Sequence, residues 1–272
     1  MITADLHLHS YCSDGTDSPE EIARKARRAG LSCIALADHD TVEGIPGCTE
    51  EARLLGLEVI PGVELTAEHE GSEVHILGYL IDWEQAAFRE KLQELRKTRV
   101  ERIYTMLEKL EEAGITLAPE SVFSLAKQGT VGRLHLARAM VNAGIVSHVS
   151  EAFQRYIGDR CPAYVGHFKL TPADAINLIT GAGGIPVLAH PYSLNNDELI
   201  GVLAKHGLRG LEVYYPEHSQ SMINAYLRMA AEYGLLATGG SDYHGAAKPE
   251  LVLGDFTVPY ELVQKLKDAK KP

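Results

Sequence analysis

Apolar and polar positions follow a strand–helix rhythm in the first part of the chain. Short apolar runs that are typical of buried strands occur at 2–8, 33–37, 57–60 and 74–80. Helical patterns lie between them at about 19–29 and 45–55. Ser18-Pro19-Glu20-Glu21 combines an N-cap residue, a first-turn proline and two acidic residues, which is typical of a helix start. This rhythm predicts parallel strands with helices packed outside them.

The pattern changes between residues 84 and 162. Glu84–Ala113 predicts one long helix, and shorter helical patterns follow at 119–127, 134–142 and 149–156. No strand pattern interrupts these segments. We therefore predict that residues 98–162 form a helical cap inserted into another domain, with residues 84–98 as its stalk.

The alternation of strands and helices resumes after Pro162. Strand patterns occur at 185–189, 210–214 and 235–238, and helical patterns occur at 171–181, 197–206, 219–233 and 260–269. With the N-terminal strands this gives about seven strands, which fits a closed or nearly closed α/β barrel. The predicted barrel comprises residues 1–97 and 163–272, and the predicted cap comprises residues 98–162.

Composition narrows the classes of function. The chain has 272 residues, with 26 Lys and Arg against 37 Asp and Glu, and a formal net charge of −11. This acidity disfavours binding along an extended nucleic-acid backbone but allows binding of a short phosphorylated end. The four cysteines form no C-x-x-C pair and the first residues do not resemble a signal peptide, so we expect a cytoplasmic protein with reduced thiols. Residues 175–196 lack charged side chains, but their glycines and prolines argue against a membrane span.

Histidines and carboxylates gather where the predicted strands end. They are His7, His9, Asp14, His39, Glu64, His75, His190, Asp242 and His244. Taken alone, His7 and His9 would equally fit the polar face of a half-buried strand. Several strands share the feature, however, and α/β barrels build their active sites at this end.

The mixture of imidazoles and carboxylates suits zinc, manganese or iron rather than calcium. The set is too large for a single four-coordinate ion, so we predict two or three divalent ions. We expect Glu64 to bridge them from a rigid turn at Pro61 and Gly62.

The same residues stand in motifs that resemble those of the PHP (polymerase and histidinol phosphatase) phosphoesterases. The motifs are D-L-H-L-H-S…S-D-G (5–15), D-H-D (38–40), G-V-E (62–64), H-I-L-G (75–78), A-H-P (189–191) and G-G-S-D-Y-H (239–244). They occur in the family's order and in both barrel segments. The resemblance implies a distorted (β/α)7 barrel, similar to a TIM barrel, with a trinuclear metal site.

The resemblance also implies how the ligands are shared among the ions. One ion would be held by His7, His9, Glu64 and Asp242, a second by Glu64, His75 and His190, and a third by Asp14, His39 and His244. Histidinol-phosphate phosphatases usually have histidine where this chain has Asp14. G-R-L-H-L-A-R-A (132–139) and F-Q-R-Y-I-G-D-R-C-P-A-Y-V (153–165) look like the branch that acts on nucleoside 3′,5′-bisphosphates and on 5′ ends of short RNA.

These features predict an enzyme that hydrolyses a phosphate monoester, with a hydroxide that bridges two metal ions as the nucleophile. The expected target is the 3′-phosphate of a nucleoside 3′,5′-bisphosphate, with 5′→3′ exonuclease activity on short RNA as an additional activity. A phosphatase of histidinol phosphate or another small molecule is the alternative enzyme. A metal-binding module without catalysis is the alternative of another class.

Further residues are candidates for supporting roles. Asp5, Asp38 and Asp40 would orient the ligand imidazoles by accepting their second N–H, and capping of strand ends is the alternative. Weaker candidates for contacting substrate are His167, Lys169 and Lys248.

Cationic residues of the predicted cap would contact the substrate. Arg133, His135 and Arg160 would hold a phosphate or ribose, since arginine binds phosphate with two hydrogen bonds; a packing or surface role is the alternative for each. His218 would contact phosphate or protonate the leaving oxygen, unless it only starts a helix. The expected partner is a small nucleotide or a short single-stranded RNA end, with no long duplex and no membrane.

Overall fold

The computed structural model describes residues 2–127, 129–166 and 170–270. Its centre is one eight-stranded sheet in the order β7-β6-β5-β4-β3-β2-β1-β8. The strands are β1 (Thr3–Leu8), β2 (Cys33–Leu36), β3 (Glu58–His69), β4 (Ser72–Tyr79), β5 (Ile185–Leu188), β6 (Gly210–Tyr214), β7 (Leu236–Gly239) and β8 (Val258–Pro259). The His9 N–H donates to the Tyr243 carbonyl at 3.0 Å, which joins the end of β1 to the segment after β7. The predicted α/β barrel is therefore present as a nearly closed sheet.

The strand directions correct the expectation of parallel strands throughout. Parallel pairs join β1 to β2, β2 to β3, β5 to β6 and β6 to β7, but β4 is antiparallel to both β3 and β5. Glu70 and Gly71, both with positive φ, form the two-residue turn between β3 and β4. That turn replaces the helix that a parallel connection would need. The two-residue strand β8 pairs antiparallel with β1.

The course of β3 also corrects the predicted surroundings of Glu64. The strand does not end at residue 60 but continues to His69, so Pro61 and Gly62 are strand residues. Glu64 pairs with Leu77 in the β3–β4 ladder. A strand paired on one side with β2 and on the other with β4, rather than a turn, therefore fixes this carboxylate.

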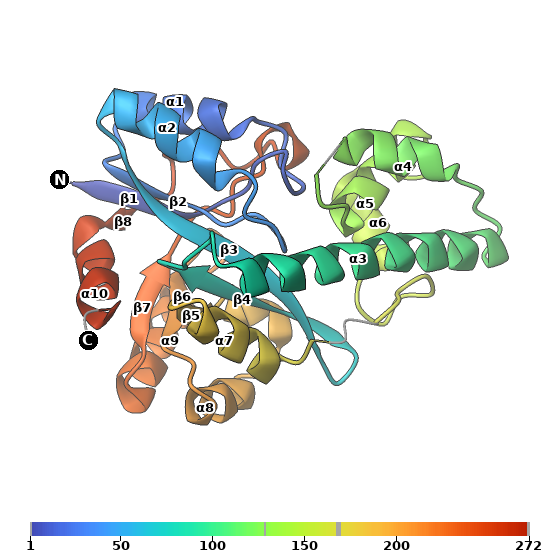
Figure 1. The fold of residues 1–272 in the computed structure, drawn as a ribbon. Coiled ribbons are helices and arrows are strands. Elements are labelled where there is room, and N and C mark those ends of the chain that lie inside the picture. Colours follow the sequence, from blue (N-terminus) through green and yellow to red (C-terminus); the bar gives the residue numbers. More distant parts are fainter. Residues whose placement is uncertain (1, 128, 167–169, 271–272) are drawn as a thin grey trace.

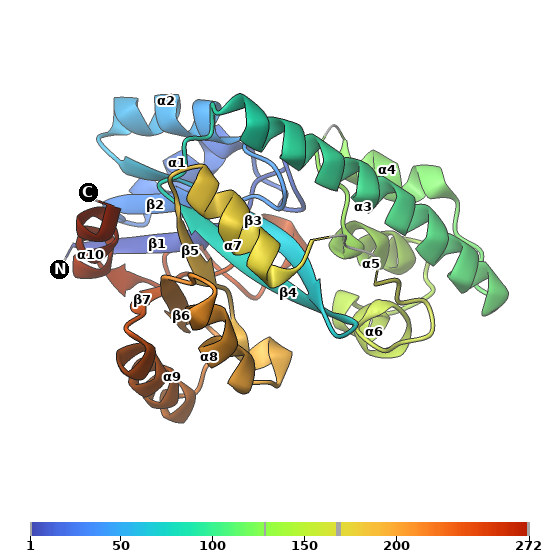
Figure 2. The same ribbon diagram turned by 60° about the horizontal axis from the view of Figure 1, so that its bottom comes forward.

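Helices cover the outer face of the sheet (Figure 2). They are α1 (Pro19–Arg28), α2 (Ile45–Leu55), α7 (Pro172–Gly181), α8 (Glu198–Lys205), α9 (Gln220–Tyr233) and α10 (Tyr260–Lys270), with short 3-10 turns η2 (Pro191–Leu194) and η3 (Gly245–Ala247) after β5 and β7. The predicted start of α1 is confirmed. The Glu21 N–H donates to the Ser18 hydroxyl at 3.1 Å, and the Glu21 carboxylate accepts from the Ser18 N–H at 2.8 Å.

Apolar side chains lock the strands beneath the ends that carry the histidines. One buried cluster joins β1–β5 to α10 and includes Leu6, Ile60, Leu77 and Val187. Fully buried Tyr79 lies in the same cluster, and its hydroxyl donates to the Leu6 carbonyl at 2.9 Å. This packing ties strands that are distant in sequence into a rigid base.

A separate group of helices projects from the barrel. It consists of α3 (Ala86–Glu112), α4 (Pro119–Ala126), α5 (Arg133–Asn142), α6 (Val149–Ala152) and the π-helical turn η1 (Phe153–Ile157). Figure 1 shows α3 running outward from the sheet, with α4, α5 and α6 gathered along its outer half. These helices share an apolar cluster of their own, which includes Ile103, Met106, Leu110 and Met140. Residues 86–157 are called the helical region below.

Within the described ranges, no helix is both long and apolar enough to cross a membrane.

Candidate metal centre

The structure brings the predicted metal ligands together at one end of the barrel. Three groups have ligand atoms within 4.8 Å of one another: His9, Asp14, His39 and His244; His7, His9, Glu64 and Asp242; and His39, Glu64 and His75. His190 extends the third group, because its Nε2 lies 3.3 Å from His75 Nδ1. His75 stands near the start of β4, and the antiparallel direction of β4 is what places it at the same end as the others.

Glu64 lies at the centre of this arrangement. Its Oε2 lies 3.2 Å from each of three imidazole nitrogens, which belong to His7, His9 and His39. Its Oε1 lies 2.9 Å from His75 Nδ1 and 3.1 Å from His190 Nε2. The two oxygens thus face different groups of histidines, which is the geometry that a bridging carboxylate requires.

The hydrogen-bonding state of these atoms tests whether the residues fit metal ions. Among the described residues, the buried side-chain atoms without a hydrogen-bond partner include His7 Nε2, His9 Nε2, His39 Nδ1, Asp14 Oδ1 and Glu64 Oε2. An unsatisfied buried polar atom costs roughly 1–3 kcal/mol, so several at one place are expensive unless a ligand satisfies them. Since the unsatisfied atoms are imidazole nitrogens and carboxylate oxygens, a divalent transition metal fits the donor set.

The pKa shifts of His9, His75 and Glu64 show that the part of the cluster around Glu64 favours positive charge. Burial lowers the pKa of His9, but Asp242 and Glu64 outweigh burial and raise it to about 9. Burial likewise opposes the charged form of His75, whereas Glu64 raises its pKa to about 10. Burial alone would raise the pKa of Glu64, yet the surrounding histidines hold it well below its usual range. Without a metal, protons take the place of the cations that these carboxylates favour.

Asp5, Asp38 and Asp40 act differently from the predicted orientation of imidazoles. Asp5 accepts from the Ser241 N–H at 2.9 Å and from its hydroxyl at 2.6 Å, and burial raises the pKa of Asp5 to about 6. Asp38 accepts from Ser10 and from the Ser13 hydroxyl. Each carboxylate thus braces a loop that carries a candidate ligand, which is close to the alternative of strand-end capping.

Asp40 joins the barrel to the helical region. It accepts from the Thr66 N–H at 3.0 Å and from Arg99 Nε at 2.5 Å, and Arg99 lies on α3. Neither contact involves an imidazole. Asp40 therefore fixes α3 against β3, beside the candidate ligand His39.

Two other carboxylates contact the imidazoles instead. Glu212 on β6 accepts from His7 Nδ1 at 2.9 Å, and Glu73 on β4 lies 3.1 Å from His75 Nε2. Sequence reasoning missed both residues, although signals existed. Glu212 is the one charged residue in the apolar strand 210–214, and Glu73 stands two positions before His75 and hence on the same strand face.

Arg133 is already paired within the protein. Its Nη2 lies 2.8 Å from Glu73 Oε2, and its Nη1 lies 2.7 Å from Asp159 Oδ1. Arg102 on α3 contacts the same Glu73 oxygen at 2.8 Å. The structure thus shows Arg133 in a packing role between α5 and β4, and its contact with substrate stays a prediction.

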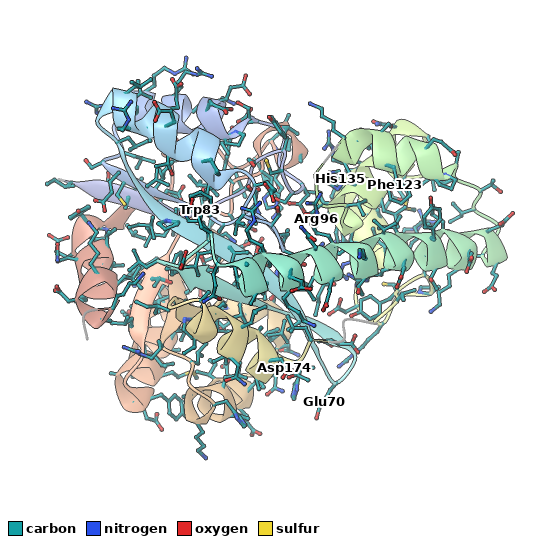
Figure 3. All side chains as sticks on the ribbon, in the orientation of Figure 1. Glu70, Trp83, Arg96, Phe123, His135 and Asp174 are labelled. Carbon is teal, nitrogen blue, oxygen red and sulfur yellow. The ribbon has the colours of Figure 1, made fainter. Side chains whose placement is uncertain are left out.

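The N-terminus of α5 lies against the candidate metal ligands. Gly132, the N-cap of α5, is so close that a Cβ placed on it would lie 3.8 Å from Asp14 Oδ2. His135 is almost fully buried, and Figure 3 shows it on the side of the helical region that faces the barrel. Its Nδ1 accepts from the Gly132 N–H at 3.1 Å, and burial lowers its pKa to about 4. The ring is therefore neutral near pH 7, with its proton on Nε2.

Arg138 lies on the same face of α5, three residues after His135. Its side chain is partly exposed and has no hydrogen-bond or ion-pair partner in the part of the chain that the structure describes. Burial lowers the pKa of Arg138, and the charge of Asp14 opposes that shift. Sequence reasoning missed this residue, although it stands in the quoted motif at 132–139.

The remaining candidates have different surroundings. His218 donates from Nδ1 to the Val213 carbonyl at 2.8 Å, and burial lowers its pKa, so its neutral Nε2 is an acceptor rather than a proton donor. Lys248 Nζ lies 2.7 Å from Asp242 Oδ2. Arg160 is exposed, with positive φ. His167 and Lys169 lie outside the described residues.

Comparisons with known proteins identify a matching family model and similar proteins. Residues 5–158 match the family model of the PHP domain. A 5′-3′ exoribonuclease of Haemophilus influenzae is 36% identical, over 88% of this chain and 89% of that protein. A 3′,5′-nucleoside bisphosphate phosphatase of Chromobacterium violaceum is 33% identical, over 90% of this chain and 88% of that protein. A crystal structure from Bifidobacterium adolescentis, described as a presumed metal-dependent phosphoesterase, superposes with a TM-score of 0.89 at 31% identity, over 99% of this chain and 96% of that chain.

Proposed function

Since this chain belongs to the PHP family of metal-dependent phosphoesterases, we propose that it removes the 3′-phosphate of nucleoside 3′,5′-bisphosphates and degrades short RNA from its 5′ end. The Chromobacterium relative is named as a phosphatase of 3′,5′-nucleoside bisphosphates, and the Haemophilus relative is named as a 5′-3′ exoribonuclease. One observation carries the proposal most strongly. The unsatisfied imidazole and carboxylate atoms lie beside the N-terminus of α5, and Arg138 on this helix has no hydrogen-bond or ion-pair partner among the described residues.

The candidate ligands divide into three sites in this proposal. His7, His9, Glu64 and Asp242 hold one ion; Glu64, His75 and His190 hold a second; Asp14, His39 and His244 hold a third, and manganese, zinc and iron all suit such donors. Bound divalent ions would lower the pKa of coordinated water and neutralise the charge of the phosphate. Glu64 is shared because each of its oxygens faces a different group of histidines.

The helical region acts as a cap in this proposal, and α5 contributes its binding groups. The N-terminus of a helix attracts anions, and Gly132 places that terminus beside Asp14. His135 Nε2–H and the Arg138 guanidinium lie on the same helix face. With one phosphate at the metal ions, these two donors would bind a second phosphate of the same substrate. Such a site selects a nucleotide with two phosphates over a molecule with one.

The test compares substrates on the metal-loaded protein. Adenosine 3′,5′-bisphosphate, a 5′-phosphorylated RNA trinucleotide and histidinol phosphate are assayed in parallel for release of phosphate or mononucleotide, with a metal-chelated sample as control. We expect metal-dependent turnover of the bisphosphate and the trinucleotide. Turnover of histidinol phosphate alone would replace the proposed substrate with a small phosphate ester. If the metal-loaded protein turned over none of the three substrates, the remaining interpretation would be a metal-binding module without catalysis.

A further inference from the structure

Glu212 contacts two candidate metal ligands from different strands at once. It lies on β6, and its side chain is 0% exposed. Its Oε1 accepts from His7 Nδ1 at 2.9 Å, and its Oε2 accepts from the backbone N–H of His190 at 2.8 Å. Both oxygens of one fully buried carboxylate are therefore used to hold residues of β1 and of the β5 end.

The hydrogen bond between Glu212 and His7 determines which ring nitrogen of His7 carries the proton. An imidazole that donates from Nδ1 keeps a lone pair on Nε2. His7 Nε2 lies 3.2 Å from Glu64 Oε2 and 3.6 Å from Asp242 Oδ1, and it lacks a hydrogen-bond partner in the described residues. Glu212 thus turns the lone pair of His7 toward the group formed with Glu64 and Asp242.

The second contact holds a strained backbone. His190 has φ 25° and ψ 62°, a left-handed conformation that is unfavourable for a residue with a side chain. The hydrogen bond from its N–H to Glu212 fixes this conformation, in which His190 Nε2 lies 3.1 Å from Glu64 Oε1. The same carboxylate therefore sets a ligand of the other group around Glu64.

We propose that Glu212 is a positioning residue that sets two neighbouring metal sites together, one through the ring of His7 and the other through the backbone of His190. The inference rests on the metal centre proposed above. It predicts that loss of the Glu212 carboxylate weakens both sites in parallel, whereas an ordinary packing residue would change stability without a specific effect on metal affinity.

Glu212→Gln is the sharpest variant because it keeps the shape and changes the hydrogen bonding. The His190 N–H is always a donor, so the amide oxygen of Gln is required there. The amide NH2 then faces His7 Nδ1, which must become an acceptor, and this moves the His7 proton to Nε2. A protonated Nε2 cannot bind a metal. Glu212→Asp keeps the charge but is too short to reach both partners.

The experiment measures metal affinity by competition with a chelator, using zinc as the probe, and checks the fold by circular dichroism. Loss of an outer carboxylate typically weakens metal binding by roughly 10–100-fold. We expect that loss for Glu212→Gln, affecting at least two bound zinc ions, and a smaller loss for Glu212→Asp. Glu217→Gln on the following loop, which removes an exposed carboxylate, is the matched control and should bind zinc as the wild type does.

A measurement on the wild-type protein covers the case in which the variants do not fold. In the zinc-loaded wild type, NMR should show a slowly exchanging proton on His7 Nδ1. Absence of that proton, or wild-type zinc affinity in folded Glu212→Gln, would overturn the inference and leave the metal centre standing. A wild-type protein that binds no zinc, manganese or iron would instead refute the proposed metal centre.

Discussion

The ligand-bearing end of the barrel and the helical region both bury charged groups, but they satisfy them in opposite ways. At the barrel end, His7 Nε2, His9 Nε2 and Glu64 Oε2 converge and lack hydrogen-bond partners among the described residues. In the helical region, Arg99 and Arg102 are bonded to Asp40 and Glu73 on the barrel strands or their loops. Buried charged groups that pair with each other stabilise the fold. Buried polar atoms that converge without hydrogen-bond partners instead indicate a site for a ligand. In the helical region, the groups that we propose for substrate binding are His135 and Arg138, and Arg138 has no hydrogen-bond or ion-pair partner in the described part of the chain.

The largest expected effect comes from Glu64, which contacts both groups of histidines. We expect Glu64→Ala to lower kcat/KM by about 1,000-fold or more, because loss of even an outer residue of a metal site costs roughly 10–100-fold and Glu64 directly faces several candidate ligands. Metal content measured by mass spectrometry should fall with the activity. If the folded variant kept its full metal content, the shared role of Glu64 would be wrong.

Arg133 tests the opposite side of the comparison. Arg133→Met removes one partner of a buried network with Glu73 and Asp159, and such losses cost about 3 kcal/mol of unfolding free energy. The value lies at the low end of the usual range because Arg102 still pairs with Glu73. Urea unfolding measures the loss. A variant of unchanged stability with a raised KM would instead support the predicted contact of Arg133 with substrate.

His135, which lies on α5 at the barrel side of the helical region, should make the free energy of unfolding depend on pH. Its pKa falls from 6.5 to about 4 on folding, so the unfolded chain binds the proton more readily between these values. Its contribution is complete above pH 6.5 and is lost progressively as the pH falls toward 4. Between pH 6.5 and 5 the loss is about 2 kcal/mol.

Comparison with His135→Asn isolates this titration, because the other groups titrate in both proteins. The asparagine side chain offers an acceptor for the Gly132 N–H but carries no titrating group in this range. Unfolding free energies at pH 6.5 and 5 should therefore differ less in the variant. If the unfolding free energy depended on pH equally in both proteins, folding would not lower the pKa of His135.

Much of the barrel, and the gathering of the candidate ligands at one end of it, could be predicted because the relevant signals are local. Buried strands, helix caps and candidate ligands directly after some strands are visible within a few residues, as at Ser18–Glu21 and at 38–40. The β3–β4 hairpin was missed because the predicted strand ended at residue 60, well before the two-residue turn at Glu70 and Gly71. The resulting long strand, not a Pro-Gly turn, carries Glu64.

Contacts between distant residues could not be predicted in this way. His7 and Glu212 are 205 residues apart, and Arg133 meets Glu73 only after the helical region has folded back onto β4. The sequence does not show whether a cationic side chain on a helix is paired within the protein or is available to bind a substrate. The structure separates Arg133 from Arg138 on this point, and the sequence had favoured the former.

The smallest expected effect is the one that distinguishes these two arginines. Arg138→Ala removes a guanidinium with no partner among the described residues, so stability should change little. A charge-assisted contact to phosphate is worth about 1.5 kcal/mol at a partly exposed site, so KM for adenosine 3′,5′-bisphosphate should rise roughly tenfold at unchanged kcat. KM for adenosine 3′-monophosphate, which lacks the second phosphate, should not change, and Arg138→Lys should restore part of the difference. If KM changed equally for both substrates, Arg138 would not bind the second phosphate.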